Sequence, residues 1–453
     1  MECIIEPITW FLEYFPEINE DEEFVLSKYI VTKEIDDKIL LYHTMSWGLY
    51  IMSKEEYAKI LTSRYFKQLR AVVNKSVDER PIAEKVYYRR SVTDTPNTYD
   101  FINSFVIFTT TACNARCPYC YEKGTAFITM KEETALDCVD FMIEKSKGHK
   151  IHINWFGGEP LMNTKVIDLI CNTLIDRGPE YTSSIISNGL LFNEEMVKKA
   201  KSLWLLEWAQ ITIDGEHDTY NATKNYQNPQ CDPFEKVVEN IKLLVKEDIH
   251  VKIRINLNDS NIDTFDDNVG SIKERFEDEI HQGKISVNPA LIYGSFLDGY
   301  NEEFNDKLSA VYDKYPDIIR TNREKRVIKP ITLMHCMADI GTGIAINPQG
   351  YIEPCEHWRD DLVMGHIKSG ITNEDVIKFW QNKEGNLDFC KEWDCPLIPC
   401  CEHMNNCPGT PGCLTESYWK QVLIEMDRMM ERTYRHYLAD KEAEEEENNN
   451  SEE

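Results

Sequence analysis

No apolar run in the sequence approaches the roughly 18 residues of a membrane-spanning helix, so no such span is predicted. A basic region before the first apolar stretch is also lacking, which argues against a secretory signal peptide and favours a cytoplasmic protein. Hydrophobic residues make up 42% of the chain and charged residues 28%, which is typical of a soluble globular protein. A chain of 453 residues is expected to form two or three domains, each with its own core.

Positive charge is scarce, because the formal net charge is −28. Residues 440–453 hold eight acidic residues against one lysine and are predicted to form a disordered tail. The rest of the chain is still acidic. This disfavours binding to nucleic acid, which depends on basic side chains that neutralise phosphates.

Fifteen cysteines are spread unevenly along the chain, and a cytoplasmic chain of this size is not expected to use them in a disulfide framework. Three lie within residues 113–120 and eight within residues 336–413. We interpret the remaining four as ordinary buried thiols; they are Cys3, Cys138, Cys171 and Cys231.

The first cysteine group lacks a fourth ligand. Cys113, Cys117 and Cys120 have the spacing C-x3-C-x2-C, and the next cysteine, Cys138, falls in a predicted helix. A closed structural zinc or iron–sulfur site needs four ligands. Three thiolates would leave one corner of a [4Fe–4S] cluster open for chemistry; a zinc site or a chance cluster is the alternative.

Residues 101–293 alternate between strand-like and helix-like segments. Six such units predict parallel strands with right-handed crossovers, and six is short of a closed eight-unit barrel, so we expect an open, partial (β/α)6 barrel. Chemistry is expected at the carboxyl ends of the strands. The predicted strands are 105–108, 151–156, 184–187, 210–213, 251–257 and 285–293, and the predicted helices are 129–147 (opened by a capping box at Thr129), 166–177, 194–202, 234–246 and 272–279.

Residues 1–95 read as a separate small domain, with strands predicted at 23–32, 38–43 and 47–52. Ser53 and Glu56 form a capping box that predicts a helix to about residue 66; a second helix is predicted at 67–74 and a linker at 72–96. The domain is either a structural appendage or a peptide-binding module whose sheet edge accepts an extra strand.

The cysteine triad, the aromatic Tyr119 before its third cysteine and the Gly157-Gly158-Glu159-Pro160 run at the next strand together resemble the radical S-adenosylmethionine (radical SAM) superfamily. The resemblance implies that the three cysteines bind three irons of a [4Fe–4S] cluster and that SAM binds the fourth. Electron transfer would then cleave SAM into methionine and a 5′-deoxyadenosyl radical that abstracts a hydrogen atom.

The resemblance also implies a set of cofactor-binding residues. For Asn188, Asp214 and Arg254, the sequence leaves a structural role equally open. The full set is Tyr119, Gly157, Gly158, Glu159, Pro160, Ser187, Asn188, Asp214 and Arg254.

The second cysteine group begins with Cys336-x13-Gly350-x4-Cys355 and continues in a Pro- and Gly-rich segment. Zinc ribbons would normally contain C-x2-C pairs, and none occurs here. The pattern resembles the SPASM domain, which implies two auxiliary [4Fe–4S] clusters. Carried over by order, the first takes Cys336, Cys355 and Cys407, and the second takes Cys390, Cys395, Cys401 and Cys413, with Cys400 competing with Cys401.

Only three ligands for the first auxiliary cluster would leave an iron free for a substrate thiolate. Glu356, directly after Cys355, is either the catalytic proton acceptor or a solvated side chain beside the cluster loop.

Together, these resemblances predict a SPASM-type peptide maturase with a winged-helix-like leader-recognition domain at 1–95, a barrel at 96–330, a SPASM domain at 331–415 and a terminal helix at 416–439. Expected cofactors are three [4Fe–4S] clusters and SAM. Expected partners are a precursor peptide and a flavodoxin or ferredoxin electron donor. A Cys thioether is the expected product; the alternatives are formylglycine formation, a C–C crosslink, and a non-catalytic iron–sulfur or zinc scaffold.

Overall fold

The computed structural model describes residues 1–93, 101–292, 302–315, 318–319, 337–357, 362–381, 394–400 and 416–451. The chain divides into two compact units. The terminal unit comprises Met1–Pro96, Lys325–His335 and Asn382–Glu453, and the sheet unit comprises Asn97–Glu324 and Cys336–Gln381. Within the described ranges, no helix is both long and apolar enough to cross a membrane.

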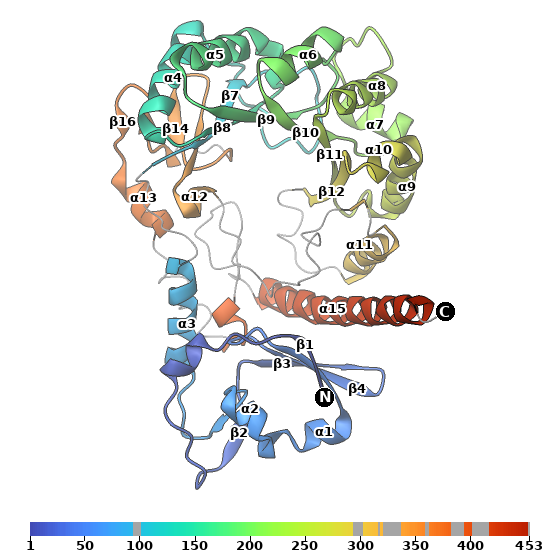
Figure 1. The fold of residues 1–453 in the computed structure, drawn as a ribbon. Helices are drawn as coiled ribbons and strands as arrows, with labels where there is room; N and C mark the ends of the chain where they lie inside the picture. The colour runs from blue at the N-terminus through green and yellow to red at the C-terminus, as the bar shows by residue number, and fades with distance from the viewer. Residues whose placement is uncertain are drawn as a thin grey trace. The chain divides into compact units, whose positions relative to one another are not determined.

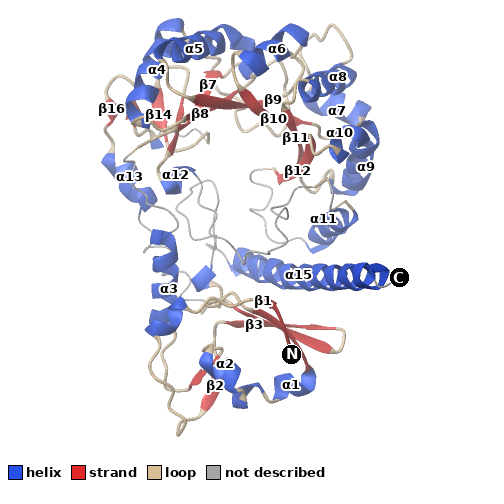
Figure 2. Cartoon of the chain, viewed as in Figure 1, coloured by secondary structure: helices blue, strands red, loops and turns tan. Residues whose placement is uncertain are grey.

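The sheet unit is built on a ten-stranded sheet in the order β12-β11-β10-β9-β8-β7-β13-β14-β15-β16. Its strands β7 to β12 are parallel and follow one another in sequence order, which confirms the six predicted strands. They form an arc with the helices along its outer side (Figures 1 and 2). The bounds are β7 Ser104–Thr110, β8 Ile151–Gly157, β9 Tyr181–Ser187, β10 Leu206–Thr212, β11 His250–Leu257 and β12 Ile285–Leu291.

The helices of the sheet unit largely follow the apolar periodicity of the sequence. The predicted helix 194–202 has the observed bounds, whereas α7, a short polar segment, was not predicted. The bounds are α4 Glu132–Ser146, α5 Thr164–Arg177, α6 Glu194–Ser202, α7 His217–Lys224, α8 Pro233–Lys246, α9 Phe265–Arg275, α10 Glu277–His281, α11 Glu302–Lys314, α12 Met337–Ile340 and α13 Glu374–Gln381, with 3-10 turns η3 Pro160–Asn163 and η4 Ile262–Thr264.

The capping box predicted at Thr129 is wrong. The N-cap of α4 is Lys131, which makes no side-chain cap bond. Thr129 instead shares a 3.0 Å hydroxyl–hydroxyl hydrogen bond with Thr110 at the end of β7. The side chain therefore ties the cysteine-bearing strand end to the following loop.

The sheet extends beyond the six predicted strands on the β7 side. β13 (Gly343–Ile346) pairs with β7 in parallel, from Gly343 opposite Ser104 to Ile346 opposite Ile107. Antiparallel strands β14 (Tyr351–Glu353), β15 (Gly365–His366) and β16 (Gly370–Ile371) follow. The strands within residues 343–371, a stretch that includes Cys355, thus continue this sheet on the β7 side.

The terminal unit contains an antiparallel sheet in the order β1-β5-β4-β3 and a two-stranded β2-β6 pair. The predicted strand 23–32 is split between β2 and β3, the predicted helix 67–74 contains β6, and the predicted linker contains α3. The Ser53–Glu56 capping box is confirmed, although its helix is short. The bounds are β1 Glu2–Ile5, β2 Phe24–Leu26, β3 Ile30–Ile35, β4 Lys38–His43, β5 Leu49–Ser53, β6 Val72–Asn74, α1 Lys54–Ala58, α2 Arg64–Gln68, α3 Arg80–Thr93, η1 Trp10–Tyr14 and η2 Ile60–Thr62.

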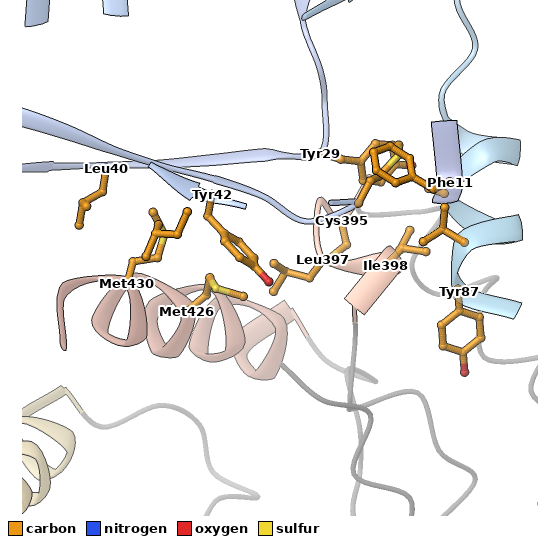
Figure 3. Close-up of a cluster of buried hydrophobic side chains, with 14 of the residues drawn as sticks. Phe11, Tyr29, Leu40, Tyr42, Tyr87, Cys395, Leu397, Ile398, Met426 and Met430 are labelled. Carbon is orange, nitrogen blue, oxygen red and sulfur yellow. The ribbon is translucent and has the colours of Figure 1, made fainter. Parts of the chain in front are cut away.

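The core of the terminal unit joins the two ends of the chain. Leu40 and Tyr42 of β4 belong to one buried cluster with Met426 and Met430 of α15 (Glu416–Ser451), as Figure 3 shows. The cluster also includes Cys395, Leu397 and Ile398, and Ile398 begins η6 (Ile398–Cys400). The C-terminal segment therefore completes a core that the sequence assigned to residues 1–95 alone.

The helix α15 continues to Ser451, which differs from the predicted helix end near residue 439 and the predicted disordered tail from 440. Glu, Lys and Ala fill residues 441–447. These residues are strong helix formers, so the acidic composition that suggests disorder is equally compatible with helix.

Candidate cofactor site

The loop that bears the three cysteines, residues 111–121 (hereafter the cysteine loop), lies against the turn that follows β8. Gly158 donates a 3.0 Å backbone hydrogen bond to Thr110, and Glu159 donates a 2.9 Å bond to the carbonyl of Ala112. A Cβ atom on Gly157 would lie 2.0 Å from the Thr110 carbonyl oxygen, and one on Gly158 would lie 2.5 Å from that of Ala112. Because the two glycines have no side chains, the end of β7 and the cysteine loop can approach this turn closely.

The Glu159 side chain is fully buried and is surrounded by donors. Its Oε1 accepts from Leu161 N at 3.1 Å and from Ser187 Oγ at 2.8 Å, and its Oε2 accepts from Asn188 N at 2.8 Å. Burial raises the pKa of this carboxyl group to about 7, against the opposing effect of the three donors. Glu159 thus joins the ends of β8 and β9.

Asn188 connects the end of β9 to the cysteine loop. Its Nδ2 donates a 2.7 Å hydrogen bond to Asn114 Oδ1 and lies 4.0 Å from Cys113 Sγ. Its backbone carbonyl accepts a 3.2 Å bond from Tyr226, whose hydroxyl is 2.9 Å from that of Tyr220. Asn188 is therefore held from two sides at the strand end.

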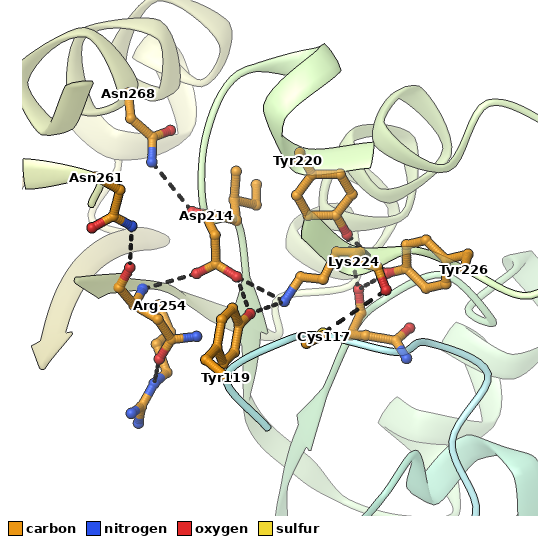
Figure 4. Close-up of polar contacts among 12 residues, drawn as sticks. Cys117, Tyr119, Asp214, Tyr220, Lys224, Tyr226, Arg254, Asn261 and Asn268 are labelled. Atoms are coloured by element: carbon orange, nitrogen blue, oxygen red, sulfur yellow. Dashed lines mark hydrogen bonds and ion pairs between the residues drawn. The ribbon is translucent and has the colours of Figure 1, made fainter. Parts of the chain in front are cut away.

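Asp214, at the end of β10, is the centre of a second polar group (Figure 4). Its Oδ2 accepts a hydrogen bond from Tyr119 and forms a 3.0 Å ion pair with Lys224. Its Oδ1 accepts a 2.8 Å bond from Asn256 N on β11. Burial, the largest single effect, lowers the pKa of Lys224, but Asp214, Tyr119 and other neighbouring groups together raise it well above its usual value.

The remaining predicted cofactor residues lie at the same edge of the sheet. Arg254 on β11 is half-buried, and its Nε donates a 2.7 Å bond to Asn256 Oδ1. Pro160 begins η3, and its carbonyl accepts a 3.0 Å bond from Thr109 Oγ1. The structure thus brings all the residues predicted for cofactor binding to the carboxyl edge of β7 to β11.

The three thiols are free and differ in exposure: Cys113 and Cys117 are half-buried, and Cys120 is exposed. Burial raises the pKa of Cys113 to about 11 and raises that of Cys120. In the described ranges, no three His, Cys, Asp or Glu side chains converge as a single metal ion would require. A cluster makes a different demand, because each thiolate binds its own iron, and three free thiols on one short loop fit it.

The loop after β14 approaches the cysteine loop. Tyr121, next to Cys120, lies with its ring centroid 5.1 Å from that of His357, two residues beyond Cys355. Cys355 and Glu356 are both half-buried there.

Most of the other predicted ligands lie outside the described residues. Cys395 is buried in the core of the terminal unit. Cys400 ends η6, and its side chain is not described. Outside the described residues lie Cys336, Cys390, Cys401, Cys407 and Cys413.

Sequence reasoning missed Asn114, Lys224 and Tyr226, which complete the hydrogen-bond network. Asn114 lies inside the cysteine motif and could have been considered. Lys224 and Tyr226 carry no local signal, because they lie in a short polar helix and the turn after it. The oxygens of Glu159, Ser187 and Asp214 already have protein partners, so their direct contact with a cofactor stays a prediction.

Residues 107–269, which span β7 to α9, match the family model of the radical SAM superfamily. One relative, the radical SAM cyclopropyl synthase TigE of Paramaledivibacter caminithermalis, is 22% identical over 432 residues, covering 84% of this chain and 89% of TigE. The sporulation killing factor maturation protein SkfB of Bacillus subtilis is 26% identical over 263 residues, covering 57% of this chain and 60% of SkfB.

Among solved structures, native anSMEcpe with bound AdoMet and Cp18Cys peptide superposes with a TM-score of 0.53. It is 16% identical, and the match covers 75% of this chain and 99% of that chain. At this identity the likeness concerns the fold alone.

Proposed function

We propose that this chain is a radical SAM enzyme that installs a crosslink in a peptide, because residues 107–269 match the family model of the radical SAM superfamily. The observation that carries the proposal is the pair of backbone hydrogen bonds by which the Gly157–Pro160 turn holds Thr110 at the end of β7 and Ala112 of the cysteine loop. This contact places three free thiols at the carboxyl edge of a parallel sheet, where such folds hold their reacting groups.

Cys113, Cys117 and Cys120 would hold a [4Fe–4S] cluster that supplies, with SAM, the radical chemistry when bound. The exposed position of Cys120 keeps one side of the loop accessible. Glu159, Asn188 and Asp214 fix the loop from three strand ends. Two further clusters on the second cysteine group, and Glu356 as proton acceptor, complete the proposed machinery.

A peptide substrate is supported by one relative, by one fold neighbour and by the terminal unit. SkfB is named a maturation protein, and the fold neighbour anSMEcpe was solved with a Cp18Cys peptide. In the terminal unit, β3 is an edge strand, and Thr44 N bonds the Tyr29 carbonyl at 2.9 Å. Along an antiparallel pair, residues that hydrogen-bond to the partner strand alternate with residues that do not. The backbone N–H and C=O groups of Thr32 and Glu34 therefore point away from β4, toward a strand that could be added.

We propose a Cys thioether as the product, since the Cys355 loop contacts the cysteine loop and is predicted to carry an auxiliary cluster with an open iron. A C–C bond is the second candidate, because the matched share of this chain is larger for the cyclopropyl synthase TigE than for SkfB. Both bonds form with the loss of two hydrogen atoms, so the product mass is the same. Whether the Cys of the product peptide still reacts with iodoacetamide separates the two.

The first experiment is anaerobic reconstitution with iron and sulfide, followed by dithionite and SAM. We expect about 12 iron atoms per chain for three [4Fe–4S] clusters, no zinc, and dithionite-dependent 5′-deoxyadenosine. Cys113→Ala should abolish 5′-deoxyadenosine formation, whereas Cys231→Ala, far from the motif in sequence, should not. Cys231 is exposed, so its interpretation as a buried thiol was wrong. Zinc in place of iron, or no SAM cleavage by the wild type, would contradict the proposal.

The leader-binding role is tested at the edge strand rather than by deletion, because removing residues 1–95 would strip α15 of its core partners. Thr32→Pro should remove an outward backbone donor and weaken precursor binding, while 5′-deoxyadenosine formation without peptide is retained. Thr32→Ala removes the same side chain but keeps the backbone donor, so it is the control. Equal precursor affinity of Thr32→Pro and Thr32→Ala would exclude strand addition at β3.

A further inference from the structure

Lys224, the last residue of α7, is almost fully buried, with 4% of its side chain exposed. Transferring an ammonium group from water to a protein interior is unfavourable unless the group is well paired. The residue lies outside the cysteine motif and outside every predicted binding position. Its placement therefore needs a physical reason.

The Lys224 ammonium joins two groups of the site. Its Nζ lies 3.0 Å from Asp214 Oδ2 and donates a 3.0 Å hydrogen bond to the Tyr119 hydroxyl, which itself donates to the same carboxylate. These side chains come from α7, from the end of β10 and from the cysteine loop (Figure 4). The buried charge thus fixes the residue before Cys120 to a strand end.

The backbone after α7 holds the other part of the cysteine loop. The Lys224 carbonyl accepts a 2.9 Å bond from Arg116 N and lies 4.0 Å from Cys117 Sγ. Three residues later, Gln227 N donates a 2.9 Å bond to the Asn114 carbonyl. Together with the Lys224 side chain, which bonds Tyr119, this turn contacts the loop on both sides of Cys117.

The position of Lys224 also has an electrostatic consequence. Its ammonium group contacts Tyr119, the residue before Cys120, and its carbonyl lies 4.0 Å from Cys117 Sγ, so the positive charge lies beside the cysteine loop. Reduction of a bound cluster adds one negative charge, and a fixed positive charge in a water-poor site favours the reduced state.

We propose that Lys224 is a positioning residue that fixes the cysteine loop against Asp214 and raises the reduction potential of the cluster held there. The proposal rests on the proposed function, because it requires a [4Fe–4S] cluster on Cys113, Cys117 and Cys120. Lys224 itself does not contact the substrate in this proposal. It acts through Tyr119 and through its charge.

The test is an EPR-monitored redox titration, without SAM, of the reconstituted protein in which Cys355, Cys390 and Cys395 are replaced by Ala to silence the auxiliary clusters. Lys224→Met removes the charge and keeps the side-chain length; Lys224→Arg keeps the charge. Asp214→Asn removes the opposing charge, and the Lys224→Met/Asp214→Asn double variant leaves no unpaired buried charge. Lys246→Met, at an exposed position, changes the net charge equally and is the control.

Lys224→Met should lower the midpoint potential and Asp214→Asn should raise it, whereas Lys224→Arg, Lys246→Met and the double variant should stay near the parent. If Lys224 had a merely structural role, both single variants would loosen the loop and shift the midpoint potential in the same direction. If Lys224→Met fails to fold, the midpoint potential of the double variant must still be lower than that of Asp214→Asn.

Two failures are distinguishable. A parent protein without a reducible [4Fe–4S] signal contradicts the proposed function. A normal parent signal with equal potentials in all variants, or with shifts of the same sign in both single variants, overturns only the role of Lys224.

Discussion

The Thr44 hydroxyl donates a 2.6 Å hydrogen bond to the carbonyl of Pro396, 352 residues further along the chain. Around this contact, the second face of the N-terminal sheet is covered by residues 394–400 and by α15. Lys33 on β3 forms a 3.0 Å ion pair with Glu431 of α15 and a second one with Asp427. The proposed leader-binding sheet and the late part of the cysteine-rich segment therefore belong to one folding unit.

The first prediction concerns this shared core. Leu397 is fully buried in it, so Leu397→Ala should destabilise the terminal unit by about 2–5 kcal/mol through lost burial and the cavity left behind. Hydrogen exchange of β4 peptides should then be faster, although β4 precedes Leu397 by more than 350 residues. Leu438→Ala, at an exposed position on α15, is the control. Unchanged protection of β4 in Leu397→Ala would mean that the N-terminal sheet folds independently.

The second prediction is a pH dependence that originates at His43. This ring is fully buried, neither of its nitrogens has a hydrogen-bond partner, and burial lowers its pKa from about 6.5 to about 3. Between these values the unfolded state binds a proton that the folded state does not, so stability falls as the pH falls. The slope contributed by this one group is about 1.4 kcal/mol per pH unit.

Urea denaturation of the terminal unit at pH 7 and pH 5 measures this effect. His43→Leu should lose less stability between the two pH values than the wild type, by roughly 2 kcal/mol. His281→Gln, at an exposed position in the sheet unit, should behave as the wild type does. An equal loss in His43→Leu and wild type would show that His43 titrates normally in the folded chain.

The sequence predicted the six central strands because both faces of a parallel sheet are covered, which leaves compact apolar runs such as Phe105–Phe108. It could not predict β13, a four-residue segment whose strand identity depends on pairing with β7 more than 230 residues earlier. β1 and β6 were missed for the same reason, since each is short and pairs with a distant strand. Non-local pairing is invisible to a local pattern.

The site shows the same division. The cysteines and Gly157–Gly158 could be predicted from local sequence. The cysteine spacing is a short motif, and the glycines lie where backbone atoms approach too closely for a Cβ atom. The partner of Asp214 could not be predicted from the sequence. Lys224 is ten residues away on a helix with little apolar periodicity, and only the fold brings the two charges together. Buried polar networks are specified by tertiary structure.

The third prediction tests the contact between the β8 turn and the cysteine loop. A Cβ atom on Gly158 would meet the carbonyl oxygens of Ala112 and Thr111 at 2.5 and 2.6 Å, and backbone atoms cannot rotate away. Gly158→Ala should therefore displace the loop and lower the iron content of a reconstituted protein that retains only the first three cysteines. Gly270→Ala, inside α9, approaches only the Tyr315 hydroxyl at 3.1 Å and should retain full iron content. Full occupancy in Gly158→Ala would show that the loop does not need this close approach.

The fourth prediction concerns Glu159, whose two oxygens receive three donors. At pH 8, above its pKa of about 7, the side chain is ionised and can accept all three bonds. In Glu159→Gln, an amide NH2 group must face one of these donors, which costs about 1–3 kcal/mol for a buried mismatch. Ser187→Ala removes one donor and leaves the carboxylate two, so its cost should be smaller, about 0.5–1.5 kcal/mol.

Thermal unfolding of the metal-free sheet unit within the full chain ranks these two variants against the wild type. The mismatch in Glu159→Gln should also loosen Asn188, because its backbone N–H bonds Glu159 while its side chain bonds Asn114 of the cysteine loop. Iron release to a chelator after reconstitution should therefore be fastest in Glu159→Gln, slower in Ser187→Ala and slowest in the wild type. If Ser187→Ala were the more damaging variant in both measurements, the carboxylate would not be the group that joins β8 to β9.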